Sequence, residues 1–448
     1  MIDFLLETFA ANREREAIVW RDVPATYGWL LESVRAWQRK LDGEGLPSGA
    51  VVAVEADFSP NAVALFLALA GRGDVVVPLT SSVAAKRETF LETAGVEAVV
   101  SIDAADEGRT ARRSPGPEHP LYRQLRESGH PGLVLFSSGS TGESKAALHD
   151  LSGILEKFRT PRHARRTISF LLYDHIGGVN TMLYTLSNAG CLVTVADRSP
   201  DAVLAAVERH RVELLPTSPT FLNLMLLSGA AERHDLSTLQ TITYGTEPMP
   251  QSTLERLHEL LPSVTLLQTY GLSEVGILRS KSKSSDSLWV KIGGEGFETR
   301  VVDGALQIRA RSAMLGYLNA PSPFTEDGWL ATGDAVETDG DYVRILGRRS
   351  EIINVGGEKV YPAEVESVIQ KVDNVAAVTV RGERNPITGQ IVCARVTPVL
   401  PEDPKELALR VKAFCRERLA PFQVPVKVQV TADRQYSDRF KKTRRIDA

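Results

Sequence analysis

Short apolar segments that alternate with helix-like segments constrain the fold of this chain more than any other feature. Residues 51–54 and 75–79 are apolar runs with the length of buried strands, and residues 61–70 between them have the length and composition of a buried helix. The same alternation continues from residue 168 to residue 268. A strand–helix–strand order favours parallel strands that are covered by helices. The sequence therefore predicts an α/β fold with helix-covered sheets.

The ends of the predicted strands indicate where a ligand would bind. In open α/β sheets, ligands bind beyond the carboxyl ends of the strands. Loops of small and polar residues begin at Ser137, Gly245 and Tyr270, each directly after or close behind a predicted strand, so we expect them to form walls of one pocket. Residues 104–120 are polar and rich in charge, glycine and proline, and we predict a surface loop there.

The length of the chain and a change of pattern predict two domains. A chain of 448 residues is long for a single core. From residue 297 onward, short alternating strands replace the strand–helix pattern, and residues 347–350 resemble a linker. About a hundred residues follow, a common domain size, with a mixed order of helices and strands. We predict a large N-terminal domain, residues 1–346, and a small α+β C-terminal lid domain, residues 347–448.

Composition excludes several classes of function. The formal charge of −4 gives no electrostatic case for nucleic-acid binding. The three cysteines are far apart in sequence, which suits neither a disulfide framework nor a metal cluster and fits a reducing cytosol. The first residues carry Asp3 and Glu7 and do not resemble a signal peptide, and no apolar stretch is long enough to span a bilayer. We therefore expect a cytoplasmic protein without a membrane anchor.

The loop after residues 133–136 has the composition of a phosphate-binding loop. Glycines permit close approach and unusual dihedral angles, so backbone N–H groups and hydroxyls can surround a phosphate. It is not a Walker loop, because its glycine and lysine are not adjacent. An ordinary surface turn is the alternative. The residues concerned are Ser137, Ser138, Gly139, Ser140, Thr141, Gly142 and Lys145.

Six segments agree in order and spacing with one family. The chain resembles the ANL superfamily of adenylate-forming enzymes, which contains acyl- and aryl-CoA ligases, peptide-synthetase adenylation domains and luciferases. The resemblance covers nearly the whole chain, including a phosphate loop, an adenine and magnesium motif, a ribose motif and a hinge. The segments are residues 26–30, 76–79, 137–145, 268–274, 332–334 and 347–362.

The resemblance implies a reaction in two steps. A carboxylate attacks the α-phosphorus of ATP to give an acyl-adenylate and pyrophosphate, and a thiol then attacks the acyl carbon. It implies Mg²⁺ with Glu274 as a ligand and catalytic residue, adenine stacked on Tyr270, and ribose bound by Asp334 with Arg348 nearby. The other nucleotide-binding positions that it implies are Gly245, Thr246, Glu247, Pro248, Gly271 and Ser273.

The C-terminal lysine motif departs from the family pattern. The family has Gly-Lys-x-x-Arg, and the lysine assists adenylation. Here the glycine is missing and two lysines compete. Lys442 is the preferred catalytic residue, because Thr443 then takes the place of a β-branched residue and Arg445 that of the arginine. Lys441, paired with Arg444, is the alternative.

The implied hinge also departs from the pattern. The family commonly has aspartate or lysine two residues after the hinge arginine, Arg348, and this chain has Ser350. A hinge requires only a permissive backbone. We therefore still expect the C-terminal domain to rotate between an adenylating and a thiol-accepting pose.

The resemblance places the acyl pocket among three loops. His175 lies where CoA ligases have a histidine that closes the tunnel and guides the acyl group. Asp174 is one position early for the aspartate that pairs a substrate amino group in peptide-synthetase domains, which favours an acid without an α-amino group. The glycines suggest room for a flat or extended chain. The implied pocket residues are Asp174, His175, Gly177, Gly178, Tyr244, Val275 and Gly276.

Three functions are compatible with these residues. The preferred interpretation is an ATP-dependent carboxylic acid:CoA ligase, with a small-molecule acid and coenzyme A as partners. The second is a free-standing adenylation enzyme that loads the phosphopantetheine arm of a carrier protein. The third is a nucleotide-binding protein that has lost catalysis, which the altered lysine motif and Ser350 would favour.

Overall fold

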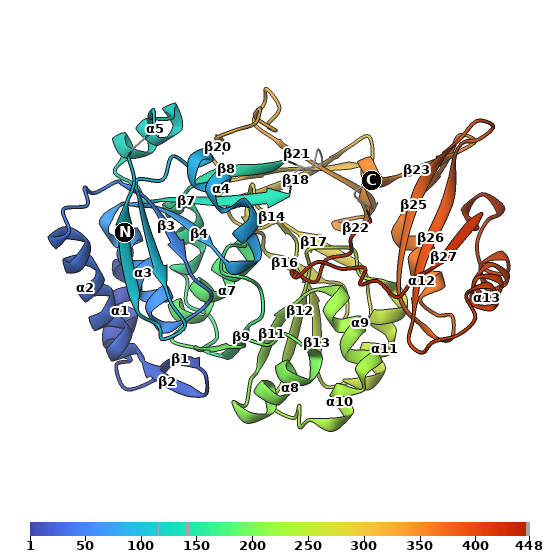
Figure 1. Ribbon diagram of the computed structural model, residues 1–448, viewed down its shortest axis with the longest axis horizontal. Helices are drawn as coiled ribbons and strands as arrows, with labels where there is room; N and C mark the ends of the chain where they lie inside the picture. Colours follow the sequence, from blue (N-terminus) through green and yellow to red (C-terminus); the bar gives the residue numbers. More distant parts are fainter. Residues whose placement is uncertain (115, 139–142, 445–448) are drawn as a thin grey trace.

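The structure is a computed structural model that describes residues 1–114, 116–138 and 143–444 (Figure 1). Its N-terminal part contains two seven-stranded sheets and one six-stranded sheet, and its C-terminal part contains a five-stranded sheet. The expected fold class is confirmed, with helix-covered sheets in a large N-terminal domain and a smaller α+β domain after it.

The first seven-stranded sheet carries the hairpin that contains the predicted phosphate loop. Its order is β20-β8-β7-β4-β3-β5-β6, with parallel pairs at the centre and an antiparallel β7–β8 pair. The strands are β3 (Val51–Glu55), β4 (Val75–Leu79), β5 (Ala98–Ile102), β6 (Gly108–Arg112), β7 (Gly132–Ser138), β8 (Ser144–Asp150) and β20 (Gly316–Tyr317).

The prediction of a loop over residues 104–120 is wrong in part, because β6 lies within it. This strand pairs antiparallel with β5 at the edge of the sheet, and most of its side chains are not buried. An edge strand needs only main-chain hydrogen bonds on one side and tolerates charged side chains. It therefore lacks the apolar pattern by which buried strands are recognised in a sequence.

The second seven-stranded sheet is parallel except at one edge. Its order is β13-β12-β11-β9-β10-β1-β2, and only β2 runs antiparallel to its neighbour. The strands are β1 (Glu16–Trp20), β2 (Val23–Thr26), β9 (Arg166–Ser169), β10 (Cys191–Thr194), β11 (Leu214–Thr217), β12 (Thr241–Tyr244) and β13 (Thr265–Gln268). The carboxyl ends of β9, β11, β12 and β13 lead into the loops of the site.

Helix α3 coincides with the buried helix predicted over residues 61–70. Helix α3 begins after Ser59, whose hydroxyl accepts the Ala62 N–H, and ends at Gly73 with φ of +82°. The largest hydrophobic cluster joins α3 and α7 to strands of both seven-stranded sheets, so these helices form a shared core. The helices of this domain are α1 (Asp3–Ala11), α2 (Tyr27–Gly43), α3 (Pro60–Arg72), α4 (Arg87–Thr93), α5 (Pro120–Ser128), α6 (Leu151–Leu155), α7 (Ile176–Ser187), α8 (Pro200–Arg209), α9 (Pro219–Ser228), α10 (Ala230–Arg233) and α11 (Gln251–Leu260).

An antiparallel sheet connects the N-terminal domain to the C-terminal part. Its order is β16-β17-β22-β21-β19-β18, and the short pair β14 (Gly271–Leu272) and β15 (Gly276–Ile277) precedes it. Strand β22 ends at Arg348, so the proposed domain boundary after residue 346 falls inside it and stays a prediction. The strands are β16 (Ser280–Ser282), β17 (Trp289–Ile292), β18 (Phe297–Val302), β19 (Ala305–Ala310), β21 (Leu330–Asp339) and β22 (Tyr342–Arg348).

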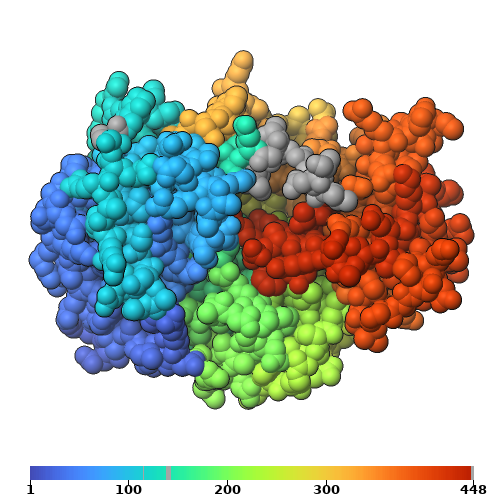
Figure 2. Space-filling view, in the orientation of Figure 1, coloured from blue at the N-terminus to red at the C-terminus, as the bar shows by residue number. Residues whose placement is uncertain are grey.

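The C-terminal domain has its own hydrophobic core between a sheet and two helices. Figure 2 shows its last segment, in dark red, extending from this domain across to the N-terminal domain. No helix within the described ranges is both long and apolar enough to cross a bilayer. The elements are β23 (Ile353–Val355), β24 (Glu358–Val360), α12 (Pro362–Ile369), β25 (Val375–Asn385), β26 (Gly389–Pro398), α13 (Pro404–Arg416) and β27 (Lys427–Val430).

Candidate active site

The C-terminal hairpin, residues 435–443, reaches the N-terminal domain. A bridge between Tyr436 and Lys442 and a hydrogen bond of 3.0 Å from the Ser437 N–H to the Lys441 carbonyl define it. Its turn places Phe440 at φ of +51°, in the left-handed region that favours glycine. Phe440, which directly precedes Lys441, thus has a backbone conformation that is typical of glycine.

Aromatic packing anchors the hairpin. The Phe440 ring lies 5.2 Å from the ring of Phe170, which follows β9, and 5.7 Å from that of Phe221 on α9, between ring centroids. The Ser218 hydroxyl donates a hydrogen bond of 2.8 Å to the Phe440 carbonyl. These contacts offset the cost of the left-handed backbone and join the hairpin to the carboxyl ends of two strands.

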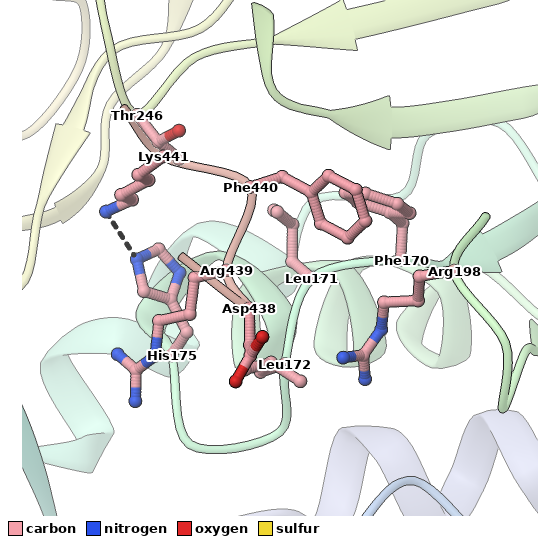
Figure 3. A pocket seen from close by; sticks show the side chains of 10 residues that line it. All are labelled: Phe170, Leu171, Leu172, His175, Arg198, Thr246, Asp438, Arg439, Phe440 and Lys441. Carbon is pink, nitrogen blue, oxygen red and sulfur yellow. Dashed lines mark hydrogen bonds between the residues drawn. The ribbon is translucent and has the colours of Figure 1, made fainter. Parts of the chain in front are cut away.

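A cavity lies between the hairpin and the N-terminal domain, and its residues are shown in Figure 3. Lys441 Nζ lies 3.4 Å from His175 Nε2. His175 caps helix α7, because its Nδ1 accepts the Gly177 N–H at 3.0 Å. Burial, reinforced by Lys441 and Arg439, holds the pKa of His175 well below its usual value, so the ring is neutral at pH 7. The lining residues are Phe170, Leu171, Leu172, His175, Arg198, Thr246, Asp438, Arg439, Phe440 and Lys441.

The two candidate lysines have different partners. Lys441 faces the cavity, whereas Lys442 Nζ forms an ion pair of 2.9 Å with Glu366 on α12. Arg444 also holds Glu366, at 2.8 Å. Burial opposes ionisation of Glu366, but Arg444 and Lys442 outweigh it and hold its pKa at about 2. In this pose Lys442 therefore stabilises the C-terminal domain, and Lys441, the alternative from the sequence, occupies the cavity.

The environment of Lys441 weakens its affinity for a proton. Enclosure of the ammonium group lowers its pKa to about 8, and Arg439 and Arg348 add to the shift. Glu247 and Glu274 oppose it. These four residues come from the hairpin, β22 and two loops of the N-terminal domain, so Lys441 lies within electrostatic range of three predicted site residues, Arg348, Glu247 and Glu274.

The structure brings the phosphate-loop lysine close to the predicted metal ligand. Lys145 Nζ lies 5.1 Å from the centre of the Tyr317 ring, and the Tyr317 hydroxyl donates a hydrogen bond of 2.5 Å to Glu274 Oε1. Ser137 and Ser138 end strand β7 and pair with Lys145 and Ser144. Nothing in the sequence identified Tyr317. The remaining loop positions, Gly139, Ser140, Thr141 and Gly142, lie outside the described residues.

The predicted adenine and ribose residues are in direct contact. The Tyr270 hydroxyl donates a hydrogen bond to Asp334 Oδ2, and Arg348 Nε lies 3.0 Å from Asp334 Oδ1. Arg348 also donates to the Thr332 carbonyl. Burial raises the pKa of Asp334, against the opposing effects of Arg348 and Tyr270. Each carboxylate oxygen has a second lone pair for a further donor.

The loop over residues 245–248 positions the hairpin. A Cβ at Gly245 would lie 2.6 Å from the Thr269 carbonyl oxygen, so only glycine fits there. Glu247 accepts a hydrogen bond of 2.8 Å from the Thr220 N–H and one of 3.0 Å from the Lys442 N–H. Thr246 lines the cavity. The predicted contacts of this loop with adenine, including those of Pro248, stay predictions.

The segment over residues 271–273 is also closely packed. A Cβ at Gly271 would lie 2.4 Å from the Ile277 Cδ1 atom, and the Ser273 carbonyl accepts a hydrogen bond of 2.5 Å from His149 Nε2. These contacts fix the backbone on either side of Glu274. The predicted roles of Gly271 and Ser273 in nucleotide binding stay predictions.

The glycines of the predicted acyl pocket have close neighbours. A Cβ at Gly177 would lie 2.6 Å from Leu171 Cδ1, and one at Gly178 would lie 2.0 Å from the Leu172 carbonyl oxygen. Both glycines therefore let the loop after β9 pack tightly on α7. The sequence alone had instead suggested that they leave room for an acyl chain. The other implied pocket residues, Tyr244 and Val275, are almost fully buried, and Gly276 has φ of +80°. Their contact with an acyl group stays a prediction.

Two family models match most of the chain. Residues 5–318 match the model described as AMP-binding enzyme, and residues 364–444 match the AMP-binding enzyme C-terminal domain.

Curated relatives and a solved structure are also similar. An indoleacetate–CoA ligase of Aromatoleum aromaticum is 28% identical over 70% of this chain and 64% of its own. A methyl-dioxo-octahydroindenyl-propanoyl:CoA ligase of Rhodococcus jostii is 31% identical over 66% of this chain and 60% of its own. This chain thus spans less than two thirds of these relatives. The structure of the anthranilate CoA ligase AuaEII with anthranoyl-AMP has a TM-score of 0.80 at 19% identity, covers 96% of this chain and 93% of that one, and shows the shared fold.

Proposed function

Because the chain belongs to the AMP-binding enzymes of the ANL adenylate-forming superfamily, we propose that it is an ATP-dependent carboxylic acid:CoA ligase. In this proposal the enzyme joins an acid to AMP with release of pyrophosphate and then transfers the acyl group to coenzyme A. The names of the curated relatives, which are CoA ligases of aromatic or polycyclic acids, support both steps.

The observation that carries the proposal is the insertion of Lys441 into the cavity beside His175. Attack of a carboxylate on a phosphate brings two anions together, so a cation placed in advance lowers the barrier. We assign this role to Lys441 rather than Lys442, because Phe440 supplies the glycine-like turn before it and Lys442 is held by Glu366. Neutral His175 then borders the acyl group without adding charge.

The nucleotide would bind across residues from the six-stranded sheet and from the first seven-stranded sheet. Asp334, held by Arg348 and Tyr270, would accept hydrogen bonds from the ribose hydroxyls. Lys145 would contact the phosphates, because it begins the strand that follows the predicted phosphate loop.

Glu274 fits a magnesium ligand. Tyr317 holds its Oε1, which orients the carboxylate and leaves Oε2 to bind a cation, and carboxylate oxygens are preferred ligands of Mg²⁺. When bound with ATP, the metal would offset the charge of the phosphate oxygens.

The test is ATP–pyrophosphate exchange with panels of fatty, aromatic and amino acids, followed by addition of coenzyme A. We expect exchange with one class of acid and release of AMP when coenzyme A is added. If exchange occurs and coenzyme A does not discharge the acyl-adenylate, but the phosphopantetheine of a carrier protein does, the protein is the carrier-loading enzyme and not a CoA ligase. No exchange with any acid would contradict the proposal and favour a catalytically inactive nucleotide-binding protein.

Two alanine variants test the lysine assignment. Lys441→Ala should slow exchange by about 10² to 10³-fold, as expected for the loss of one charge contact in the transition state. Lys442→Ala should slow it less than about tenfold, because its N–H still reaches Glu247 and Arg444 still holds Glu366. The opposite order would return the role to Lys442.

A further inference from the structure

Asp174, one of the implied pocket residues, meets the C-terminal hairpin. Its Oδ2 atom lies 2.9 Å from Arg439 Nη2, a contact between residues 265 positions apart in the chain. Arg439 directly precedes Phe440, which replaces the family's glycine. The contact therefore joins the loop that contains His175 to the hairpin turn that precedes Lys441.

The surroundings of Asp174 require a cation. Its side chain is only 3% exposed, and Oδ2 also accepts a hydrogen bond of 2.9 Å from the Thr80 hydroxyl. Oδ1 is shielded from solvent and has no hydrogen-bond partner among the residues that the structure describes. An enclosed carboxylate is costly unless a cation offsets its charge. Arg439 supplies that charge at ion-pair distance, and Arg198 faces the same cavity.

The Asp174 contact is linked to the position of Lys441. Asp174 and His175 are neighbours in one loop, and Arg439 and Lys441 lie on either side of Phe440 in the hairpin. Figure 3 shows Arg439 and Lys441 beside His175 while the Phe440 ring points toward Phe170. Two contacts thus run side by side, 2.9 Å between Asp174 and Arg439 and 3.4 Å between His175 and Lys441. A displacement of the hairpin at the first contact would therefore also displace Lys441 at the second.

The charges at the interface between the hairpin and the N-terminal domain also connect the Asp174–Arg439 pair to the position of the hairpin. The hairpin brings Arg439 and Lys441 into the cavity that Arg198 and Asp438 also line, and the basic groups of one cavity repel one another. Asp174 is the acidic residue that pairs with Arg439 at this interface. Without it, docking of the hairpin would bring these basic groups together with less compensation. The pair therefore favours the docked hairpin and its orientation together.

We propose that Asp174 and Arg439 are a pair of positioning residues that hold Lys441 in place for formation of the acyl-adenylate. This inference rests on the proposed function, because it concerns the first of its two steps. Neither residue needs to contact the nucleotide or the acid. The pair acts through the hairpin, and its effect is confined to the step in which the Lys441 charge is needed.

Two single variants and their combination measure the pair. Asp174→Asn and Arg439→Gln should each lower kcat of ATP–pyrophosphate exchange by about 30-fold, since a displacement of about 1 Å at a reacting centre costs up to 10²-fold. The KM for ATP should change less than about threefold, because the contacts of Asp174 and Arg439 among the described residues do not include Asp334 or Tyr270. The double variant should be no slower than the slower single variant, as expected when each change breaks the same contact.

Three controls separate positioning from general damage. Arg439→Lys keeps the charge and should retain activity within about fivefold of wild type. Lys427→Gln breaks an exposed pair with Glu383 in the same domain and should leave exchange unchanged. Discharge of separately supplied acyl-adenylate by coenzyme A should proceed at the wild-type rate in Arg439→Gln. If Asp174→Asn fails to fold, the Arg439 variants suffice, because that residue belongs to the hairpin.

The outcomes distinguish the pair from the proposed function. With an active wild type, exchange at the wild-type rate in both single variants would overturn the pair. Additive losses in the double variant, or equal slowing of adenylate discharge, would also overturn it. Absence of exchange in the wild type with every acid would instead reject the proposed function and the pair with it.

Discussion

Raising the pH from 7 to 9 should slow adenylate formation about tenfold, because Lys441 loses its charge over this range. The pKa of Lys441 is lowered to about 8, whereas an ordinary lysine titrates near pH 10.4. A group with a pKa of about 8 is about 90% charged at pH 7 and about 10% charged at pH 9. The charged form assists the reaction, so the rate falls as pH rises through 8.

The assay is kcat/KM for ATP–pyrophosphate exchange between pH 6 and 10, with ATP far below its KM. Under these conditions the profile reports the pKa of the free enzyme. Bound phosphates would favour the charged lysine, so kcat at saturating ATP should have its basic limb at higher pH than kcat/KM. The separation of the two limbs is itself part of the prediction.

Lys442→Ala is the matched control for this profile. The variant should keep the basic limb near pH 8, because Lys442 is bound to Glu366 outside the cavity. A limb in kcat/KM that stays above pH 10 would refute the reasoning. So would loss of the limb in Lys442→Ala, since the titrating group would then be the other lysine.

Four further variants test the packing around the site. Phe440→Ala and Phe440→Gly should both slow exchange at least about tenfold through lost contact with Phe170, with the glycine variant faster because φ is +51°. The reverse order would argue against the turn. Glu366→Gln should lower the calorimetric midpoint of unfolding by several degrees, since breaking a buried pair costs about 3–5 kcal/mol. The Glu366 carboxylate contributes fully well above pH 4.5, and this contribution is lost as pH falls through about 2. Acidification should therefore narrow the difference in stability between the wild type and the variant. Gly178→Ala should lower the free energy of unfolding in urea by more than about 2 kcal/mol, because the alanine Cβ would lie 2.0 Å from the Leu172 carbonyl oxygen. A variant as stable as the wild type would show that the loop can move to accommodate the methyl group.

The local patterns of the chain were sufficient for the fold class and for several buried elements. Apolar periodicity predicted α3 and its flanking strands, because a buried element needs apolar residues at regular spacing. Motif order predicted that Tyr270, Asp334 and Arg348 belong to one site, and the structure brings them into contact. Strand β6 escaped prediction, because an edge strand depends on main-chain hydrogen bonds rather than on apolar side chains.

Spacing could not choose between the two lysines. Each begins a Lys-x-x-Arg pattern, and the sequence preference for Lys442 rested on Thr443 and Arg445. In the structure, the left-handed turn at Phe440 directs Lys441 into the cavity, and the ion pair with Glu366 directs Lys442 toward α12. The turn is held by Phe170 and Ser218 and the ion pair by Glu366, and all three lie far from the lysines in sequence.

The sequence by itself determined the alternation of buried strands and helices and the chemistry available in each loop, because both depend on residues that are close together in the chain. Only the tertiary structure decided which of these groups meet. Asp174 and Arg439, and Glu274 and Tyr317, pair across long separations, through the docking of the hairpin and the arrangement of the sheets. Such contacts depend on the packing of whole domains, and the spacing of residues along the chain does not predict them.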